Sequence, residues 1–241
     1  MKPIILVTGC TRGLGLQIVN NLLGSNFKVI GIGRKKNEAV KSIKSKFKKN
    51  FYFEEFDFIN TSNIKSFSSK LINKYGRFYG LINNAAVGLE GVLGTMHEND
   101  IRKLIKINIE APIILTKYIS RSMLIAQKGK VINISSIIGS TGFSGLSVYA
   151  ASKAAMNGFT KSLSRELGKA GITVNAIAPG YMETDMTKGL KGQKFNKIIN
   201  RSPLKKLIKP REVAKMVEFL LGADADNITG SIITIDAGST A

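Results

Sequence analysis

The stretch Thr8-Gly9-Cys10-Thr11-Arg12-Gly13-Leu14-Gly15 decides the fold of this chain. It follows a short apolar run at 3–8, and a helical pattern begins at Leu16. Glycines here permit a tight turn and a close approach of backbone to phosphate, while the helix start presents free N–H groups. A glycine pattern alone is a weak indication, because a plain strand-to-helix turn also matches it. Its position between the first strand and the first helix favours a dinucleotide-binding loop.

Short apolar runs alternate with longer amphipathic stretches throughout the 241 residues. The runs lie at 3–8, 27–32, 51–56, 79–83, 129–135, 171–177 and 231–235. Each is rich in Val, Ile or Phe, which is typical of buried parallel strands. Seven strands separated by helices predict an α/β fold: a single-domain, Rossmann-type, doubly wound seven-stranded parallel sheet with helices on both faces. No linker or repeat divides the chain, so we expect one NAD(P)-binding domain over residues 1–241.

One long stretch, from Ala178 to about Arg201, is expected to be irregular. It begins with Pro179-Gly180 and contains two further glycines, Gly189 and Gly192. Because it follows a strand, and loops of this length often form active-site lids, we expect a substrate lid at about 180–205.

The composition excludes several classes of site. The single cysteine, Cys10, forms no disulfide within the chain, and with the single histidine, His97, it does not supply a zinc site, so no metal is expected. No apolar run reaches the roughly 18 residues of a membrane span, and no secretory signal is recognisable, so we expect no membrane contact and a cytoplasmic location.

The formal net charge of +20 is unusual. Many of the lysines follow the second apolar run: Lys35, Lys36, Lys41, Lys44, Lys46, Lys48 and Lys49. Such charge is compatible with nucleic-acid binding, with an acidic substrate or carrier protein, or with a solvated helix face. No known nucleic-acid motif is present and no aromatic residues interleave a basic stripe, so we favour the solvated face and expect no nucleic acid.

A second group of residues carries the chemistry of carbonyl reduction. Tyr149 and Lys153 share a helix face at i and i+4, Ser136 follows the fifth strand, and Asn108 lies earlier in the chain. Reduction of a carbonyl needs a proton on oxygen as hydride reaches carbon, and a free tyrosine has a pKa of about 10. A nearby ammonium group and the positive charge of an oxidised nicotinamide are expected to lower that pKa. The adjacent Ser135 is an alternative to Ser136.

These motifs together resemble the short-chain dehydrogenase/reductase family, whose nucleotide loop reads Thr-Gly-x-x-x-Gly-x-Gly. The resemblance covers essentially the whole chain. It implies that Tyr149 is the general acid or base, that Lys153 tunes Tyr149 and binds the nicotinamide ribose, that Ser136 polarises the substrate oxygen, and that Asn108 anchors a water. By the same resemblance, cofactor contacts are expected at Gly9, Thr11, Arg12, Gly13, Leu14, Gly15, Arg34, Asp57, Phe58, Asn84, Ala85, Tyr149, Lys153, Pro179, Gly180, Met182 and Thr184.

The second strand is followed by Arg34-Lys35-Lys36, where an enzyme that prefers NAD places an acid. Guanidinium and ammonium groups attract a 2′-phosphate, and Arg12 is a second candidate contact. The sequence therefore favours NADPH/NADP over NADH as the cofactor.

The exact residues within these motifs are similar to those of 3-oxoacyl-[acyl-carrier-protein] reductases. The first substrate expected is therefore a 3-oxoacyl group on an acidic carrier protein. Departures leave two alternatives open. One is a small ketone or alcohol, for example a sugar intermediate; the other is a non-catalytic nucleotide- or RNA-binding protein. Ala86 and Ala237 stand where relatives carry glycine, and alanine at position 86 would be strained if that position needs a positive φ. The family resemblance also implies a homotetramer that pairs through helices at about 98–126 and 149–169 and through the C-terminal strand.

Overall fold

Seven parallel strands form one sheet in the order β3-β2-β1-β4-β5-β6-β7, in a computed structural model that describes residues 2–182 and 193–241. The strands are β1 (Ile4–Thr8), β2 (Lys28–Gly33), β3 (Phe51–Glu55), β4 (Gly80–Asn83), β5 (Gly129–Ile134), β6 (Ile172–Pro179) and β7 (Ile232–Ile235). Each strand agrees with its predicted position to within about two residues. The central strands are buried along their whole length, as strands covered on both faces must be.

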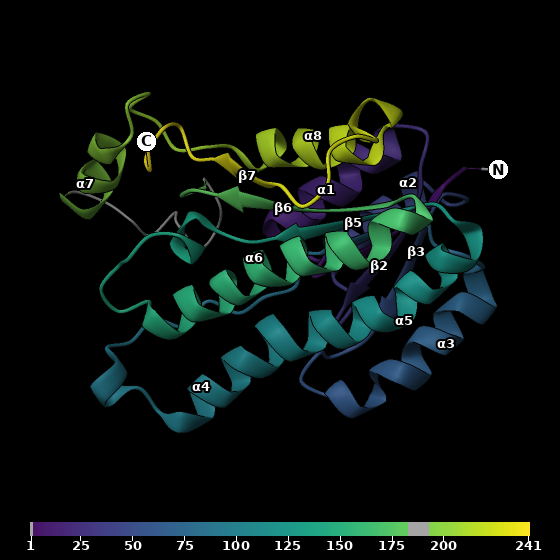
Figure 1. The fold of residues 1–241 in the computed structure, drawn as a ribbon, viewed down its shortest axis with the longest axis horizontal. Helices are drawn as coiled ribbons and strands as arrows, with labels where there is room; N and C mark the ends of the chain where they lie inside the picture. The colour runs from purple at the N-terminus through teal and green to yellow at the C-terminus, as the bar shows by residue number, and fades with distance from the viewer. Residues whose placement is uncertain (1, 183–192) are drawn as a thin grey trace.

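Helices cover both faces of the sheet and create two apolar cores (Figure 1). One face carries α1 (Gly13–Gly24), α2 (Glu38–Lys46) and α8 (Pro210–Leu221). The other carries α3 (Ile64–Tyr75), α5 (Ala111–Ala126) and α6 (Ser147–Leu167). Helix α4 (Glu98–Ile105) continues through a π-helical turn, Lys106–Glu110, into α5. This arrangement confirms the predicted doubly wound fold. No described helix is long and apolar enough to cross a membrane.

The region after β6 differs from the expectation of an irregular stretch. Residues 193–201 form the helix α7 (Gln193–Arg201). The glycines at 189 and 192 suggested a continuous loop, whereas the nine residues after them contain neither glycine nor proline and can form helical turns. Part of the expected lid, 183–192, lies outside the described residues, so its boundaries stay a prediction.

The order of the strands places the functional motifs together. Strand β1 has β2 on one side and β4 on the other, so the chain changes direction at this point. In open α/β sheets, ligands bind at such a switch point, outside the carboxyl ends of the strands. The glycine loop after β1, the turn after β4 and the segment after β5 all leave the sheet at this edge.

Candidate active site

The glycine loop is packed so tightly that side chains have no room at two positions. Gly9 has φ +68°, and a Cβ there would lie 2.9 Å from the Cα of Ala85. A Cβ on Gly15 would lie 2.2 Å from the Gly9 carbonyl oxygen. Gly13 also has a positive φ, +53°, but a Cβ there would meet nothing within 4 Å, so this part of the loop faces open space. The loop therefore presents bare backbone outward.

The start of α1 fits a phosphate-bearing cofactor. Arg12 stands at the N-cap with no side-chain capping hydrogen bond, and the first turn contains no acidic residue. Uncapped N–H groups and the positive end of the helix dipole attract phosphate. The residues present thus fit the pyrophosphate of a dinucleotide.

Thr8 and Asn84 fix the glycine loop to the end of β4. The Thr8 hydroxyl accepts hydrogen bonds from the backbone N–H groups of Asn84 and Ala85, both at 2.9 Å. The Asn84 amide donates to the carbonyls of Thr8 at 2.9 Å and Gly9 at 3.2 Å. Ala86 is not among the residues with positive φ, so alanine is unstrained there. Sequence analysis did not count Thr8 as a site residue, although it opens the glycine motif.

Two cations are exposed beside this loop. Arg12 and Arg34 are exposed, and Arg34 directly follows β2. The neighbouring acid, Glu55 at the end of β3, accepts a hydrogen bond from the backbone N–H of Lys36 at 3.0 Å. Asp57 is half-buried, and its carboxylate accepts a hydrogen bond from the Ile59 N–H at 3.1 Å. The edge of the loop is therefore dominated by positive charge.

Ser136 and Tyr149 meet beyond the end of β5. The Ser136 hydroxyl accepts a hydrogen bond from the Ile138 N–H at 3.3 Å and lies close enough to the Tyr149 hydroxyl to influence its ionisation. Burial raises the pKa of Tyr149, and the nearby Ser136 hydroxyl opposes this shift. Lys153 was expected to lower the pKa of Tyr149, but in the protein alone burial outweighs any such effect and the pKa is raised. Ser135 instead donates to the Lys153 carbonyl at 3.2 Å.

Lys153 is buried beside Tyr149. Its Nζ lies 5.6 Å from the centroid of the Tyr149 ring and donates a hydrogen bond to the Ile134 carbonyl at 2.8 Å. Burial lowers the pKa of Lys153 to about 8. No sequence motif predicts the hydrogen bond between Lys153 and the Ile134 carbonyl, because this contact depends on how α6 packs against β5.

Asn108 lies in the π-helical turn and connects two other segments. Its side chain accepts a hydrogen bond from the Val87 N–H and donates one to the Val87 carbonyl, both at 2.9 Å. It also donates to the Ser152 hydroxyl at 3.2 Å. A π turn carries one extra residue and is frequent at functional sites. Here it directs a buried amide between the turn after β4 and the helix of Tyr149.

The segment after β6 is held against the carboxyl-terminal strand. The Gly180 N–H donates to the Ile235 carbonyl at 2.8 Å, and a Cβ on Gly180 would lie 2.7 Å from the Cβ of Asp236. Met182 pairs with Ile208 in an isolated parallel bridge. Thr184, expected to contact the cofactor, lies outside the described residues.

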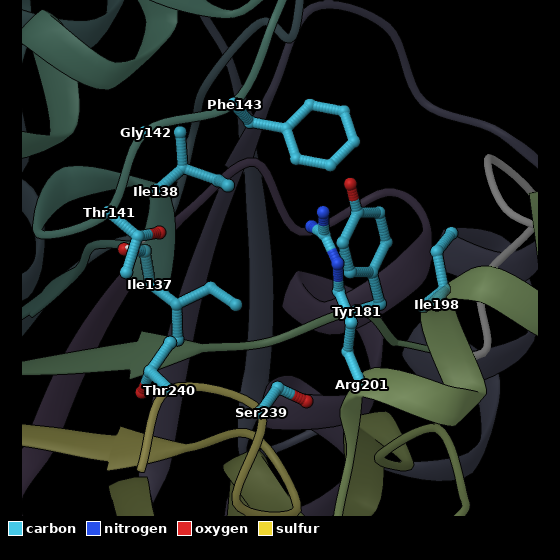
Figure 2. Close-up of a pocket in the computed structure, with 10 residues that line it drawn as sticks. All are labelled: Ile137, Ile138, Thr141, Gly142, Phe143, Tyr181, Ile198, Arg201, Ser239 and Thr240. Atoms are coloured by element: carbon cyan, nitrogen blue, oxygen red, sulfur yellow. Dashed lines mark hydrogen bonds between the residues drawn. The ribbon is translucent and has the colours of Figure 1, made fainter.

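A cavity of about 280 Å³ opens next to the Ser136 segment (Figure 2). Its lining comes from four segments: Ile137, Ile138, Thr141, Gly142, Phe143, Tyr181, Ile198, Arg201, Ser239 and Thr240. Sequence analysis named none of these as site residues. The residues at 239 and 240 reach the cavity only because β7 lies beside β6.

The sequence and the fold are both similar to known oxidoreductases. Residues 3–194 match the short chain dehydrogenase family. The chain is 34% identical to the 3-oxoacyl-[acyl-carrier-protein] reductase of Escherichia coli strain K12 over 235 residues, which are 98% of this chain and 96% of that protein. It is 33% identical to the reductase of that name from Vibrio cholerae, with the same coverage.

Solved structures agree. The structure of ElxO with NADP bound has a TM-score of 0.91 at 31% identity, over 99% of both chains. A short-chain dehydrogenase/reductase from Serratia marcescens has a TM-score of 0.92 at 25% identity, over 99% of this chain and 98% of that one. This chain therefore belongs to the short chain dehydrogenases, oxidoreductases that use a nicotinamide cofactor on CH–OH and C=O groups.

Proposed function

We propose that this chain reduces a ketone to a secondary alcohol with NADPH and that Tyr149 donates the proton. The observation that carries this proposal is the position of Tyr149 beside Ser136 and the buried Lys153, whose Nζ lies 5.6 Å from the centroid of the Tyr149 ring. When bound, the cofactor supplies the hydride, and with it both electrons, to the carbonyl carbon. Tyr149 then needs only to protonate the carbonyl oxygen, which completes the balance of the reaction.

The chain's own residues divide this task. The Ser136 hydroxyl holds the substrate oxygen within reach of Tyr149 and stabilises the negative charge that develops on it. Burial raises the pKa of Tyr149, so the hydroxyl keeps its proton at neutral pH until the oxygen becomes basic. Lys153 lies close enough to stabilise the phenolate that remains. Asn108 holds the neighbouring segments in register.

A Tyr149→Phe variant tests this assignment. Reduction should fall by at least about 100-fold, because general acid catalysis typically contributes 10²- to 10⁴-fold. Tyr52→Phe in β3 is the matched control and should keep full activity. Cofactor affinity, measured by titration, should change little in either variant. Equal rates for Tyr149→Phe and the wild type would refute the role of Tyr149.

The preference for NADPH rests on Arg12 and Arg34, which flank the glycine loop without an acid at the end of β2. ElxO, which is similar in fold, has been solved with NADP bound. Replacing both arginines by glutamine should raise the KM for NADPH by at least about 100-fold, because each charge-assisted hydrogen bond is worth about 1.5–3 kcal/mol, or at least about 10-fold. The KM for NADH should stay nearly constant. Equal or better wild-type rates with NADH would overturn the proposal.

The first candidate substrate is a 3-oxoacyl thioester on an acyl carrier protein, because the relatives above carry that name. The positive net charge would attract an acidic carrier protein. A small ketone or sugar intermediate is the second candidate, favoured by Arg201 in the cavity beside Ser136. Turnover of acetoacetyl thioester supports the first candidate, whereas turnover of free ketones alone supports the second.

We also propose a cytoplasmic homotetramer. Apolar side chains are exposed on the outer side of α5, among them Ile113 at 37% and Ile125 at 72%. Phe219 on α8 is 43% exposed. Burial of such side chains between subunits would stabilise an assembly. Light scattering coupled to size-exclusion chromatography checks the mass, and a monomer at micromolar concentration would contradict the proposal.

A further inference from the structure

The cavity beside Ser136 contains a guanidinium group held among aromatic rings. Arg201 is the last residue of α7, and its guanidinium carbon lies 5.5 Å from the centroid of the Phe143 ring. The Phe143 and Tyr181 rings are 6.3 Å apart at an interplanar angle of 62°. Figure 2 shows the Arg201 side chain running alongside Tyr181 toward Phe143. Cation–π contacts of this kind orient an arginine without consuming its N–H donors.

The lining of the cavity has a single formal charge, which is positive. Among its ten residues only Arg201 is charged, and none is an acid. Two acids lie near the lining: Asp236, whose carboxylate is hydrogen-bonded to Thr240, and Glu90, which adds to burial in raising the pKa of Tyr181, whereas Arg201 lowers it. Glu90 is exposed, is not part of the lining, and forms no recorded ion pair with Arg201 among the described residues. A ligand in this cavity therefore meets an electropositive wall.

The hydroxyl groups of the lining already donate their protons to the protein. Thr141 Oγ1 donates to the Ile137 carbonyl at 3.0 Å. Ser239 Oγ donates to the Asp236 carbonyl at 2.7 Å, and Thr240 Oγ1 donates to the Asp236 carboxylate at 2.8 Å. In the described part of the chain, Arg201 and the Tyr181 hydroxyl are the side-chain donors of the lining with no recorded hydrogen-bond acceptor. They are the groups left to donate to a ligand.

We infer that Arg201 binds a carboxylate at the far end of the substrate, so that the substrate is an oxo acid. This inference rests on the proposed carbonyl reduction and specifies its substrate. Ile137 directly follows Ser136, so the cavity lies next to the residue proposed to hold the carbonyl oxygen, and Ile138 and Ile198 provide apolar surface for a short hydrocarbon segment. A guanidinium binds a carboxylate through two parallel hydrogen bonds. A thioester meets this requirement when its acyl chain ends in a second carboxyl group.

Three pairs of ketones test the inference: acetoacetate, 4-oxopentanoate and 5-oxohexanoate, each compared with its methyl ester. The acid and the ester of a pair differ mainly in charge, and the series varies the distance between carbonyl and carboxylate. The wild type should prefer at least one acid over its ester by about 10-fold or more in kcat/KM, the size expected for hydrogen bonds to a charged group.

Variants of Arg201 identify the source of that preference. Arg201→Gln should abolish it, mainly through a higher KM for the acid, and should leave the ester unchanged. Arg201→Lys should keep part of it, because a lysine retains the charge but loses the paired hydrogen bonds. Arg211→Gln is the matched control, since Arg211 is an exposed arginine on α8 outside the cavity and its replacement removes the same charge. The control should retain the wild-type preference.

Two results would overturn the inference: a wild type that prefers no acid over its ester, or an Arg201→Gln variant that changes acid and ester alike. Calorimetric binding of hexanoate and hexanamide separates this result from a failure of the proposed reaction, because neither compound is reduced. If no ketone is reduced but hexanoate binds at least 10-fold tighter than hexanamide and Arg201→Gln removes the difference, the anion site stands and carbonyl reduction fails. Equal binding of both compounds refutes the anion site.

Discussion

The amino group of Lys153 lies in the protein interior, and only 4% of the residue is exposed to solvent. The Ile134 carbonyl accepts its hydrogen bond, but no acid is recorded as its partner among the described residues. Burial alone lowers its pKa from 10.5 to about 8. A buried cation without a counter-ion destabilises the folded state. A residue that supports the proposed chemistry therefore weakens the fold.

Replacing Lys153 by methionine should consequently stabilise the protein while it abolishes turnover. Below pH 8 the lysine is protonated in both the folded and the unfolded chain, and its burial costs about 3 kcal/mol. Between about pH 8 and 10.5 the folded chain has lost a proton that the unfolded chain keeps, so the wild type gains stability as the pH rises. The advantage of Lys153→Met should therefore be largest at pH 7 and nearly vanish by pH 10.5, as measured by urea unfolding.

The exposed Lys161 on the same helix provides the control. Lys161→Met should change the free energy of unfolding little at any pH in this range. A Lys153→Met variant that is less stable than the wild type at pH 7 would show that the hydrogen bond to Ile134 outweighs the cost of the buried charge.

Ala237 is a strained residue near the end of the chain. Its φ is +56°, a conformation that glycine adopts freely and alanine does not. Replacing it by glycine should raise the free energy of unfolding by up to about 1 kcal/mol, because the steric cost of about 1–2 kcal/mol exceeds the entropy cost of glycine. Ala39→Gly inside α2 should do the opposite by about 0.5–1 kcal/mol. Thermal unfolding compares the two, and destabilisation by Ala237→Gly would contradict the strain.

At the scale of residues, the sequence indicates the candidate functional residues better than it shows how deeply they are buried or which backbone conformation they adopt. The types and spacing of Tyr149, Lys153 and Ser136 suit one reaction, and the fold does bring Ser136 and Lys153 beside Tyr149. The raised pKa of Tyr149 was missed because it depends on burial, which arises only when α6 packs on the sheet. The strain at Ala237 was not predicted, because the sequence shows that alanine replaces a glycine but does not give φ.

The π-helical turn is the element that joins the site to the rest of the sheet. Asn108 uses both ends of its amide on Val87, as acceptor and as donor. Aspartate at this position keeps the acceptor but loses the donor. Asn108→Asp should therefore cost about 1–3 kcal/mol of unfolding free energy, close to the cost of Asn108→Ala. Urea unfolding at pH 7 measures both, with the exposed Asn99→Asp as control. A fully stable Asn108→Asp variant would show that the donor side is dispensable.

At the scale of elements, the strands were predictable and the irregularities were not. Buried parallel strands are short Val- and Ile-rich runs, and each run became a strand. A π turn has no signature in Lys106–Glu110, because it is set by the contacts that Asn108 makes across the fold. Helix α7 was not predicted, because Gly189 and Gly192 just before it indicated that the loop continues. Local patterns identify elements that are regular, whereas tertiary contacts create the exceptions.

The whole molecule carries 36 basic and 16 acidic residues, so most of its cations have no partner of opposite charge. The described residues form five ion pairs, each with at least one exposed partner, and two of them join two exposed side chains: Lys41 with Glu38 and Arg102 with Glu98. Exposed pairs contribute about 0–1 kcal/mol each. Repulsion among the remaining positive charges should then outweigh these attractions and oppose the compact state.

Salt should therefore stabilise this protein. The melting temperature should rise by a few degrees between 20 mM and 300 mM sodium chloride at pH 7, because added ions shorten the screening length from about 20 Å to below 10 Å. The buffer must contain no phosphate or sulfate, since these anions would bind the loop at the start of α1 and stabilise the fold by another route. Replacing Lys44, Lys48 and Lys49 by glutamine should raise the melting temperature at low salt and flatten its dependence on salt. A melting temperature that falls as salt is added would contradict this prediction, because it would mean that attraction within the ion pairs outweighs repulsion among the excess positive charges.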